Sequence, residues 1–225
     1  MIYYLMFMLP AIILSLVASI KVKSTFAKYS KVPSHYGLTG AEAAERMLRH
    51  AGIYDVRIER VSGFLSDHYD PSTKTLRLSP PVYDSSSVAA IGVACHEAGH
   101  AIQHAENYTW LTLRSASVPL VNFGSSASYI IILIGAFASS ANLIYLGCAL
   151  FSLVLFFSII TLPVEWNASA RAKEQMLQSG LVGVSERDGA ASVLNAAFLT
   201  YVAAAFSSLM TMLYYLMLAR GSRRR

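Results

Sequence analysis

The chain has 225 residues, of which 55% are hydrophobic and 14% are charged, and its formal net charge is +5. A soluble domain carries about a quarter charged residues, and here the deficit falls in apolar runs of about twenty residues, so the composition excludes an ordinary soluble protein. The basic ends of such a chain are typical of membrane topology signals and lipid contacts, not of nucleic-acid binding.

The first apolar run covers residues 1–20 and is followed by Lys21 and Lys23. A cleaved signal peptide would have basic residues before the apolar run and a small-residue cleavage site after it. We therefore expect an uncleaved transmembrane anchor, in which Pro10 is able to introduce a kink.

Residues 21–115 are mixed in composition and predict one small α+β domain, whose stability is marginal unless it packs against the membrane part. Thr39 and Glu42 form a capping-box pattern at the start of an amphipathic helix, which closes at Gly52. The residues expected to face inward from this helix are Ala43, Met47 and Leu48.

Alternating residues in the same domain indicate a small sheet. Residues 55–61 predict one strand, and residues 64–79 predict a hairpin that turns at the segment DPSTK, with Leu76 and Leu78 on one face. The serines that follow are available as N-caps for a further helix, which carries the sequence VACHEAGHAIQH.

The spacing of residues in this helix predicts a metal site. His96 and His100 are one helical turn apart, so both imidazoles project from one face, and Glu97 lies beside the first. In the pattern H-E-x-x-H, two histidines bind zinc and the glutamate acts as general base on a water whose pKa the ion lowers to about 7. The alternative is a chance match, expected in about one chain of this length in a hundred. Gly99 favours the metal site, because a missing side chain lets another element approach the helix closely.

Further apolar runs complete the membrane part. Two runs within residues 118–162 are separated only by the segment SSAN and predict an antiparallel transmembrane hairpin. Residues 163–190 contain a helical pattern that ends near Gly180, residues 193–218 predict a fourth span, and residues 219–225 form a basic tail. The expected fold is a mainly α membrane protein with about four transmembrane helices and a small α+β zincin-like catalytic domain that contains a short β-hairpin.

A catalytic zinc has three protein ligands and a water. His104 lies on the same helix face, but three successive turns spread over about 12 Å, so we expect it at the rim of the site or facing substrate. Glu165, just beyond the third run, can bring a carboxylate from a separate helix opposite the two imidazoles, and we predict that it is the third ligand. The alternative is a carboxylate at a helix start, where the helix dipole favours it.

The segment SDHYDP offers further candidates. His68 or Tyr69 could donate a hydrogen bond to the oxyanion that forms when an amide is attacked. The alternative for the segment, which also contains Asp67 and Asp70, is turn chemistry, because Asp before Pro with polar neighbours is common in loops. Arg171, one and a half turns beyond the predicted glutamate ligand, is also a candidate, although such residues are more often solvated or ion-paired.

The segments HEAGHAIQH, DHYDP, LRLS and TLPVEWNASARA resemble the YugP-like neutral zinc metallopeptidases, a family of small membrane proteins, and the resemblance covers nearly the whole chain. It implies a gluzincin-type peptidase, distantly like the HtpX-type membrane proteases, with the two histidines and the later glutamate as zinc ligands and Glu97 as the base. In many gluzincins an aspartate four residues after the ligand glutamate orients a ligand histidine. Here that position is Ser169, with Asn167 nearby, so the partner of the ligand histidine stays open.

These observations predict a membrane-anchored endopeptidase with one zinc ion, which acts on membrane-associated polypeptides at the bilayer surface, for example in membrane protein quality control. Basic residues gather on the side of the membrane that holds the predicted site, which favours a cytoplasmic active site. Two alternatives remain: a protease with its zinc inside the membrane, and a scaffold with a structural metal. Glu97 distinguishes the second of these, because a structural site needs no base.

Overall fold

The structure, a computed structural model, describes residues 2–63 and 65–222. Phe64, where the predicted hairpin begins, and residues 223–225 of the basic tail lie outside the described residues. The chain divides into two compact units. We call them the helical unit (Met1–Ser19, Thr112–Pro163 and Leu199–Arg225) and the α+β unit (Ile20–Leu111 and Val164–Phe198). The predicted fold class is confirmed: the protein is a mainly α membrane protein with a small α+β part.

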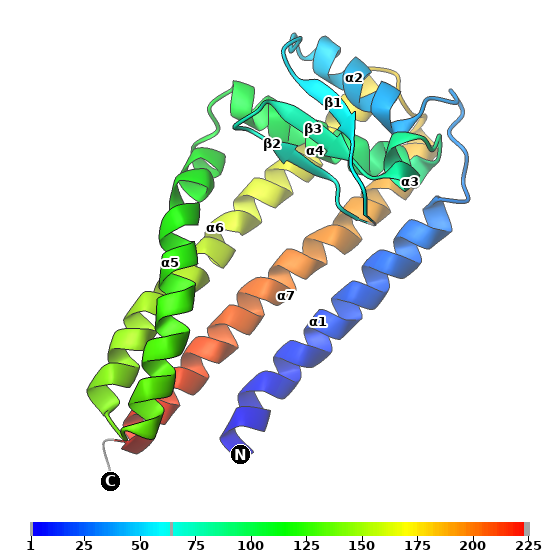
Figure 1. Cartoon of the computed structure of the whole chain (residues 1–225). Helices are drawn as coiled ribbons and strands as arrows, with labels where there is room; N and C mark the ends of the chain where they lie inside the picture. The colour runs from blue at the N-terminus through cyan, green and yellow to red at the C-terminus, as the bar shows by residue number, and fades with distance from the viewer. Residues whose placement is uncertain (1, 64, 223–225) are drawn as a thin grey trace. The chain divides into compact units, whose positions relative to one another are not determined.

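Four helices are long and apolar enough to cross a membrane (Figure 1). They are α1 (Ile2–Tyr29), α5 (Thr109–Phe137), α6 (Ala141–Gln178) and α7 (Val184–Ser222). In the helical unit many of their large apolar side chains are exposed, among them Ile12, Phe123 and Phe137. Exposed apolar surface of this extent is unfavourable in water and fits segments that face lipid.

The predicted hairpin of the second and third spans is confirmed, since only residues 138–140 separate α5 from α6. Small residues bring the two helices together: a Cβ atom added at Gly135 would lie 2.9 Å from the backbone nitrogen of Ile144. A Cβ atom at Gly124 would lie 3.2 Å from the carbonyl oxygen of Leu150. Close approach of backbones at small residues is the usual way in which helices pack within a membrane.

Helix α6 differs from the prediction at Pro163. The sequence placed Glu165 on a separate helix, but α6 continues without interruption from Ala141 to Gln178 and includes both residues. A proline in a helix interior removes one backbone hydrogen bond. The remaining backbone hydrogen bonds of a long apolar helix are sufficient to keep it helical on both sides of the proline. The third span and the predicted glutamate ligand therefore belong to one helix.

The α+β unit begins with the capped helix that the sequence predicts. In α2 (Gly40–His50) the Thr39 hydroxyl accepts a hydrogen bond from the backbone N–H of Glu42, and the Glu42 carboxylate accepts one from the backbone N–H of Thr39. The predicted inward residues Ala43, Met47 and Leu48 are all buried. The capping box and the orientation of the helix are thus confirmed.

The sheet has three strands in the order β1–β3–β2. The strands are β1 (Arg57–Arg60), β2 (His68–Asp70) and β3 (Thr75–Leu78). The predicted hairpin is the antiparallel pair of β2 and β3, and β1 pairs with β3 in parallel. Leu76 and Leu78 of the central strand are fully buried, as predicted, so β3 anchors the sheet on the core.

After a short helix α3 (Pro80–Tyr83), the chain forms α4 (Val88–Ala105), which is largely buried and contacts α2, α3, β2 and β3 (Figure 1). The Ser87 hydroxyl caps its start by accepting a hydrogen bond from the backbone N–H of Ala90, which confirms the predicted serine cap. Cys95 packs in the core, and burial raises the pKa of its thiol, so it remains a neutral apolar side chain. A helix packed on several sides holds its functional side chains in fixed positions.

Candidate metal centre

Within the α+β unit, α4 and the last turns of α6 lie in direct contact. Gly99 makes this possible, because a Cβ atom at that position would lie only 2.7 Å from the carbonyl oxygen of Ala168. The backbones of the two helices therefore meet without a side chain between them. This contact brings residues that are about seventy positions apart in sequence into one site.

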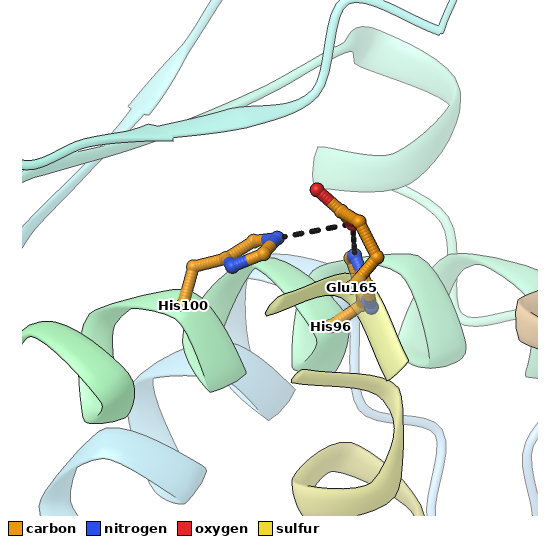
Figure 2. A group of neighbouring side chains, drawn as sticks. All are labelled: His96, His100 and Glu165. Carbon is orange, nitrogen blue, oxygen red and sulfur yellow. Dashed lines mark hydrogen bonds and ion pairs between the residues drawn. The ribbon is translucent and has the colours of Figure 1, made fainter. Parts of the chain in front are cut away.

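Three side chains converge at the contact between α4 and α6: His96, His100 and Glu165 (Figure 2). The Nε2 atoms of the two histidines lie 3.1 and 3.4 Å from the same oxygen, Oε2 of Glu165. Glu165 is 1% exposed and His100 is 8% exposed, so the group is shielded from solvent. Its ligand atoms all lie within 4.8 Å of one another, close enough for one ion.

The donor set fits zinc. Zinc binds imidazole nitrogen and carboxylate oxygen at about 2.0–2.1 Å in a tetrahedral arrangement, which places neighbouring ligand atoms about 3.3 Å apart. The two separations from Glu165, 3.1 and 3.4 Å, bracket this value. A set of three protein ligands is also the number found in catalytic zinc sites, where the fourth position is left for water or substrate.

The electrostatics of the site favour a positive charge. Burial by itself lowers the pKa of His100, but the Glu165 carboxylate outweighs burial, with a smaller effect from the negative charge of Glu97, so that the pKa is raised. The carboxylates thus stabilise a cation beside the imidazole. A divalent metal ion supplies such a charge.

Glu97 lies next to the three converging residues and is not one of them. The residue is 9% exposed. Among the residues that the structure describes, no hydrogen bond or ion pair engages it. With no partner among the described residues, this carboxylate is available to accept a hydrogen bond from a molecule bound at the site.

Both histidines are held through their second ring nitrogen. Nδ1 of His96 lies 3.1 Å from the Ser169 hydroxyl, and Nδ1 of His100 lies 3.0 Å from Oε1 of Gln103. Ser169 was a predicted candidate for this contact, whereas Gln103 was missed. Its spacing of three residues from His100 on the same helix was a signal that could have identified it.

Two other predicted residues, Asn167 and Arg171, are not among the converging ligands. Oδ1 of Asn167 accepts hydrogen bonds from Nε2 of Gln103 and from Nε of Arg171, at 2.9 and 2.8 Å. Arg171 is also paired with the Glu106 carboxylate at 2.6 Å and lowers its pKa. These residues support the site from one side and do not reach the ligand atoms.

His104 and Tyr69 contact each other. The Tyr69 hydroxyl lies 2.9 Å from Nδ1 of His104, one turn beyond His100 on α4. Burial, reinforced by the nearby charges of Asp55 and Asp70, raises the pKa of Tyr69 to about 12, so its hydroxyl keeps its proton. The other oxyanion candidate, His68, is exposed, and its ring Nδ1 lies 2.8 Å from the carbonyl oxygen of Ser66.

The two aspartates of SDHYDP are engaged in the hairpin. Asp67 accepts hydrogen bonds from the backbone N–H and the hydroxyl of Ser79. Asp70 accepts hydrogen bonds from Ser72, Thr73 and Arg77, which hold the pKa of its carboxyl well below the usual range. Both carboxylates are therefore satisfied by hydrogen bonds within the protein, and neither requires a bound ligand to explain its position.

A pocket of about 260 Å³ opens beside His104. Ile53, Val56 and Ala101 give it apolar walls, and Tyr69 contributes a hydroxyl. Drug-sized ligands need roughly 300–1,000 Å³. The pocket is therefore suited to a smaller group, such as one or two amino-acid side chains.

Comparison with known proteins agrees with the geometry. The family model described as "Putative neutral zinc metallopeptidase" matches residues 4–220. The chain is 50% identical over 215 residues to the "Putative membrane protease YugP" of Bacillus subtilis (strain 168), and the match covers 96% of each protein. No solved structure matches the chain significantly. Because the family model spans nearly the whole sequence, the chain belongs to the neutral zinc metallopeptidase family to which that description applies.

Proposed function

We propose that the protein is a membrane-anchored endopeptidase of the gluzincin type, in which His96, His100 and Glu165 hold a single zinc ion and Glu97 is the general base. The proposal is carried by one observation: three ligand atoms converge beside Glu97, whose carboxylate is unpaired among the described residues. A site that only stabilises a fold needs the ligands but has no use for the carboxylate.

Zinc at this position would lower the pKa of a water molecule to about 7 and polarise the carbonyl group of a peptide bond. Glu97 accepts a proton from the attacking water, whose oxygen forms a bond to the carbonyl carbon. The same side chain then delivers the proton to the nitrogen of the leaving amine as the carbon–nitrogen bond breaks. Glu97 ends the cycle as a carboxylate, so the net reaction is hydrolysis of the peptide bond.

The substrate we propose is a polypeptide at the membrane surface, such as a membrane protein or an unfolded segment removed during quality control. Exposed ion pairs in the α+β unit support a site in water rather than in hydrocarbon. Lys74 pairs with Asp55 at 2.5 Å, and Arg49 pairs with Glu45 at 2.7 Å. Charged groups of this kind are costly inside a bilayer, which argues against the alternative of an intramembrane protease.

Removing the metal is expected to abolish cleavage reversibly. The protein purified in detergent should contain about one zinc per chain, since the described part of the chain holds one set of three converging ligands. Treatment with a chelator should stop cleavage of an unfolded protein substrate, and added zinc should restore it. Metal content by mass spectrometry and cleavage by gel or peptide mapping are the measurements. Full cleavage by metal-free protein, or carefully loaded protein that holds no transition metal, would contradict the proposal.

We infer that the site faces the cytoplasm. The basic residues that flank the spans on the side of the site are Lys21, Lys23, Lys28, Lys31, Arg114, Arg171 and Lys173. Such an excess marks the cytoplasmic side of membrane proteins.

Cysteine labelling tests this orientation. Tyr54 is 79% exposed in the α+β unit, Gly221 is exposed near the end of α7, and both native cysteines are buried. In intact cells an impermeant maleimide should label the Gly221→Cys variant. The Tyr54→Cys variant should react only after the cells are permeabilised. The reverse pattern would place the site outside.

A further inference from the structure

Gln103 is a polar side chain on α4, one turn beyond His100. It is fully buried, and both ends of its amide are engaged. Its Oε1 lies 3.0 Å from Nδ1 of His100, and its Nε2 lies 2.9 Å from the carbonyl oxygen of Val164 and 2.9 Å from Oδ1 of Asn167. The amide therefore connects a ligand histidine of α4 to two acceptors on α6.

The chemistry of these partners fixes the direction of every bond. Arg171 can only donate hydrogen bonds, and its Nε lies 2.8 Å from the Asn167 side chain, so the facing atom is the amide oxygen. The Val164 carbonyl oxygen is also an acceptor. Because two acceptors face the same end of Gln103, that end must be the NH₂ group, which has one hydrogen for each.

The opposite end of Gln103 is then the carbonyl oxygen, which can only accept. Nδ1 of His100 must therefore carry the hydrogen of this bond. In the neutral ring the other nitrogen, Nε2, is left with a lone pair, and Nε2 is the atom that lies 3.4 Å from the Glu165 carboxylate. A lone pair facing a carboxylate is repulsive unless a second proton on the ring or a metal cation lies between them.

We propose that Gln103 is a positioning residue, which fixes the hydrogen of His100 on Nδ1 and so keeps Nε2 available as a metal ligand. This inference rests on the proposed function, and it adds an orienting partner for His100 to the contact that Ser169 makes with His96. Asn167 accepts a hydrogen bond from the Gln103 amide and so holds that amide in the required direction. Ser169 lacks this effect on His96, because a hydroxyl can either donate or accept.

Zinc affinity of the purified full-length protein, measured by competition with a chromogenic chelator, tests the inference. Gln103→Met keeps the size of the side chain but offers no strong acceptor, and we expect it to weaken zinc binding about 10- to 100-fold, as is typical when an orienting partner is removed. Asn167→Leu should also weaken binding. Asn167→Asp should bind zinc more tightly than Asn167→Leu, since a carboxylate still accepts from both Gln103 and Arg171.

Gln178→Met is the matched control, because Gln178 is exposed on α6 and bonds only to Glu174 among the described residues. It should leave zinc affinity unchanged. Circular dichroism of each variant shows whether the fold is kept. A folded Gln103→Met variant with full zinc affinity would overturn the inference, and so would equal losses in Asn167→Asp and Asn167→Leu.

Nitrogen-15 spectra of histidine-labelled protein give a readout that needs neither zinc nor cleavage. In the unmodified protein, Nδ1 of His100 should carry a hydrogen both with and without zinc, and in Gln103→Met this preference should be lost. A neutral His100 ring with its hydrogen on Nε2 would reject the inference. If instead the hydrogen is on Nδ1 but the protein binds no zinc, the orienting role stands and the proposed function fails.

Discussion

Replacing Glu97 with glutamine is expected to leave zinc bound and to lower kcat/KM for peptide cleavage by about 10²- to 10⁴-fold, the usual contribution of a general base. Glutamine has nearly the same shape as glutamate but cannot accept and return a proton. Glu97 is not among the three converging ligand residues, so the metal site should remain intact. The measurement combines zinc content with steady-state cleavage of a peptide found with the unmodified enzyme.

Glu45→Gln is the matched control for this variant, because Glu45 is an exposed carboxylate on α2 whose ion pair with Arg49 lies at the surface. It should cleave as the unmodified protein does. Equal cleavage by Glu97→Gln would remove the claim that the protein is a peptidase of this mechanism. Zinc binding without cleavage in any form of the protein would favour a scaffold with a structural metal. Proteomics of membranes that carry Glu97→Gln in place of the unmodified protein should reveal the substrates as fragments that disappear.

Replacing Glu165 with glutamine is expected to release zinc and, with it, all cleavage. Glu165 supplies the only negative charge among the three converging side chains, and both histidines lie within 3.4 Å of its carboxylate oxygen. A neutral amide oxygen is a much weaker ligand for a divalent cation. The loss of zinc affinity should therefore exceed the 10- to 100-fold loss that follows removal of an outer orienting contact.

Zinc content after dialysis against a weak chelator checks this expectation, with circular dichroism to confirm the fold. Glu174→Gln serves as control, because Glu174 is an exposed carboxylate on the same helix. It should retain full zinc content. A Glu165→Gln variant that keeps one zinc per chain would show that the third ligand is a different residue, and the proposed site would have to be redrawn.

Local patterns in the sequence were sufficient for most of the secondary structure. The capping box at Thr39 and Glu42 and the alternation around Leu76 and Leu78 each depend on residues within a few positions of one another. The same is true of the one-turn spacing of His96 and His100, which requires only that the segment be helical. These features could be predicted because the periodicities of helices and strands place residues a few positions apart on the same face.

The helix end that the sequence predicted at Pro163 was wrong, because it could not be judged from local patterns. A proline in a helical pattern usually marks an end, and only the extended packing of α6 shows that the helix continues through it. The error did not displace Glu165 from its predicted neighbourhood. The structure instead places Glu165 within the same helix as the third span, α6.

The sequence by itself determined that the protein has apolar spans, a small α+β part and an H-E-x-x-H helix, because these follow from composition and from contacts between near neighbours. The tertiary structure alone decided that Glu165 meets the two histidines and that the Gln103 amide bonds to Val164 and Asn167 of α6. Both depend on the close approach of α4 and α6 at Gly99. Such an approach is set by the packing of whole helices, and no spacing within either helix encodes it.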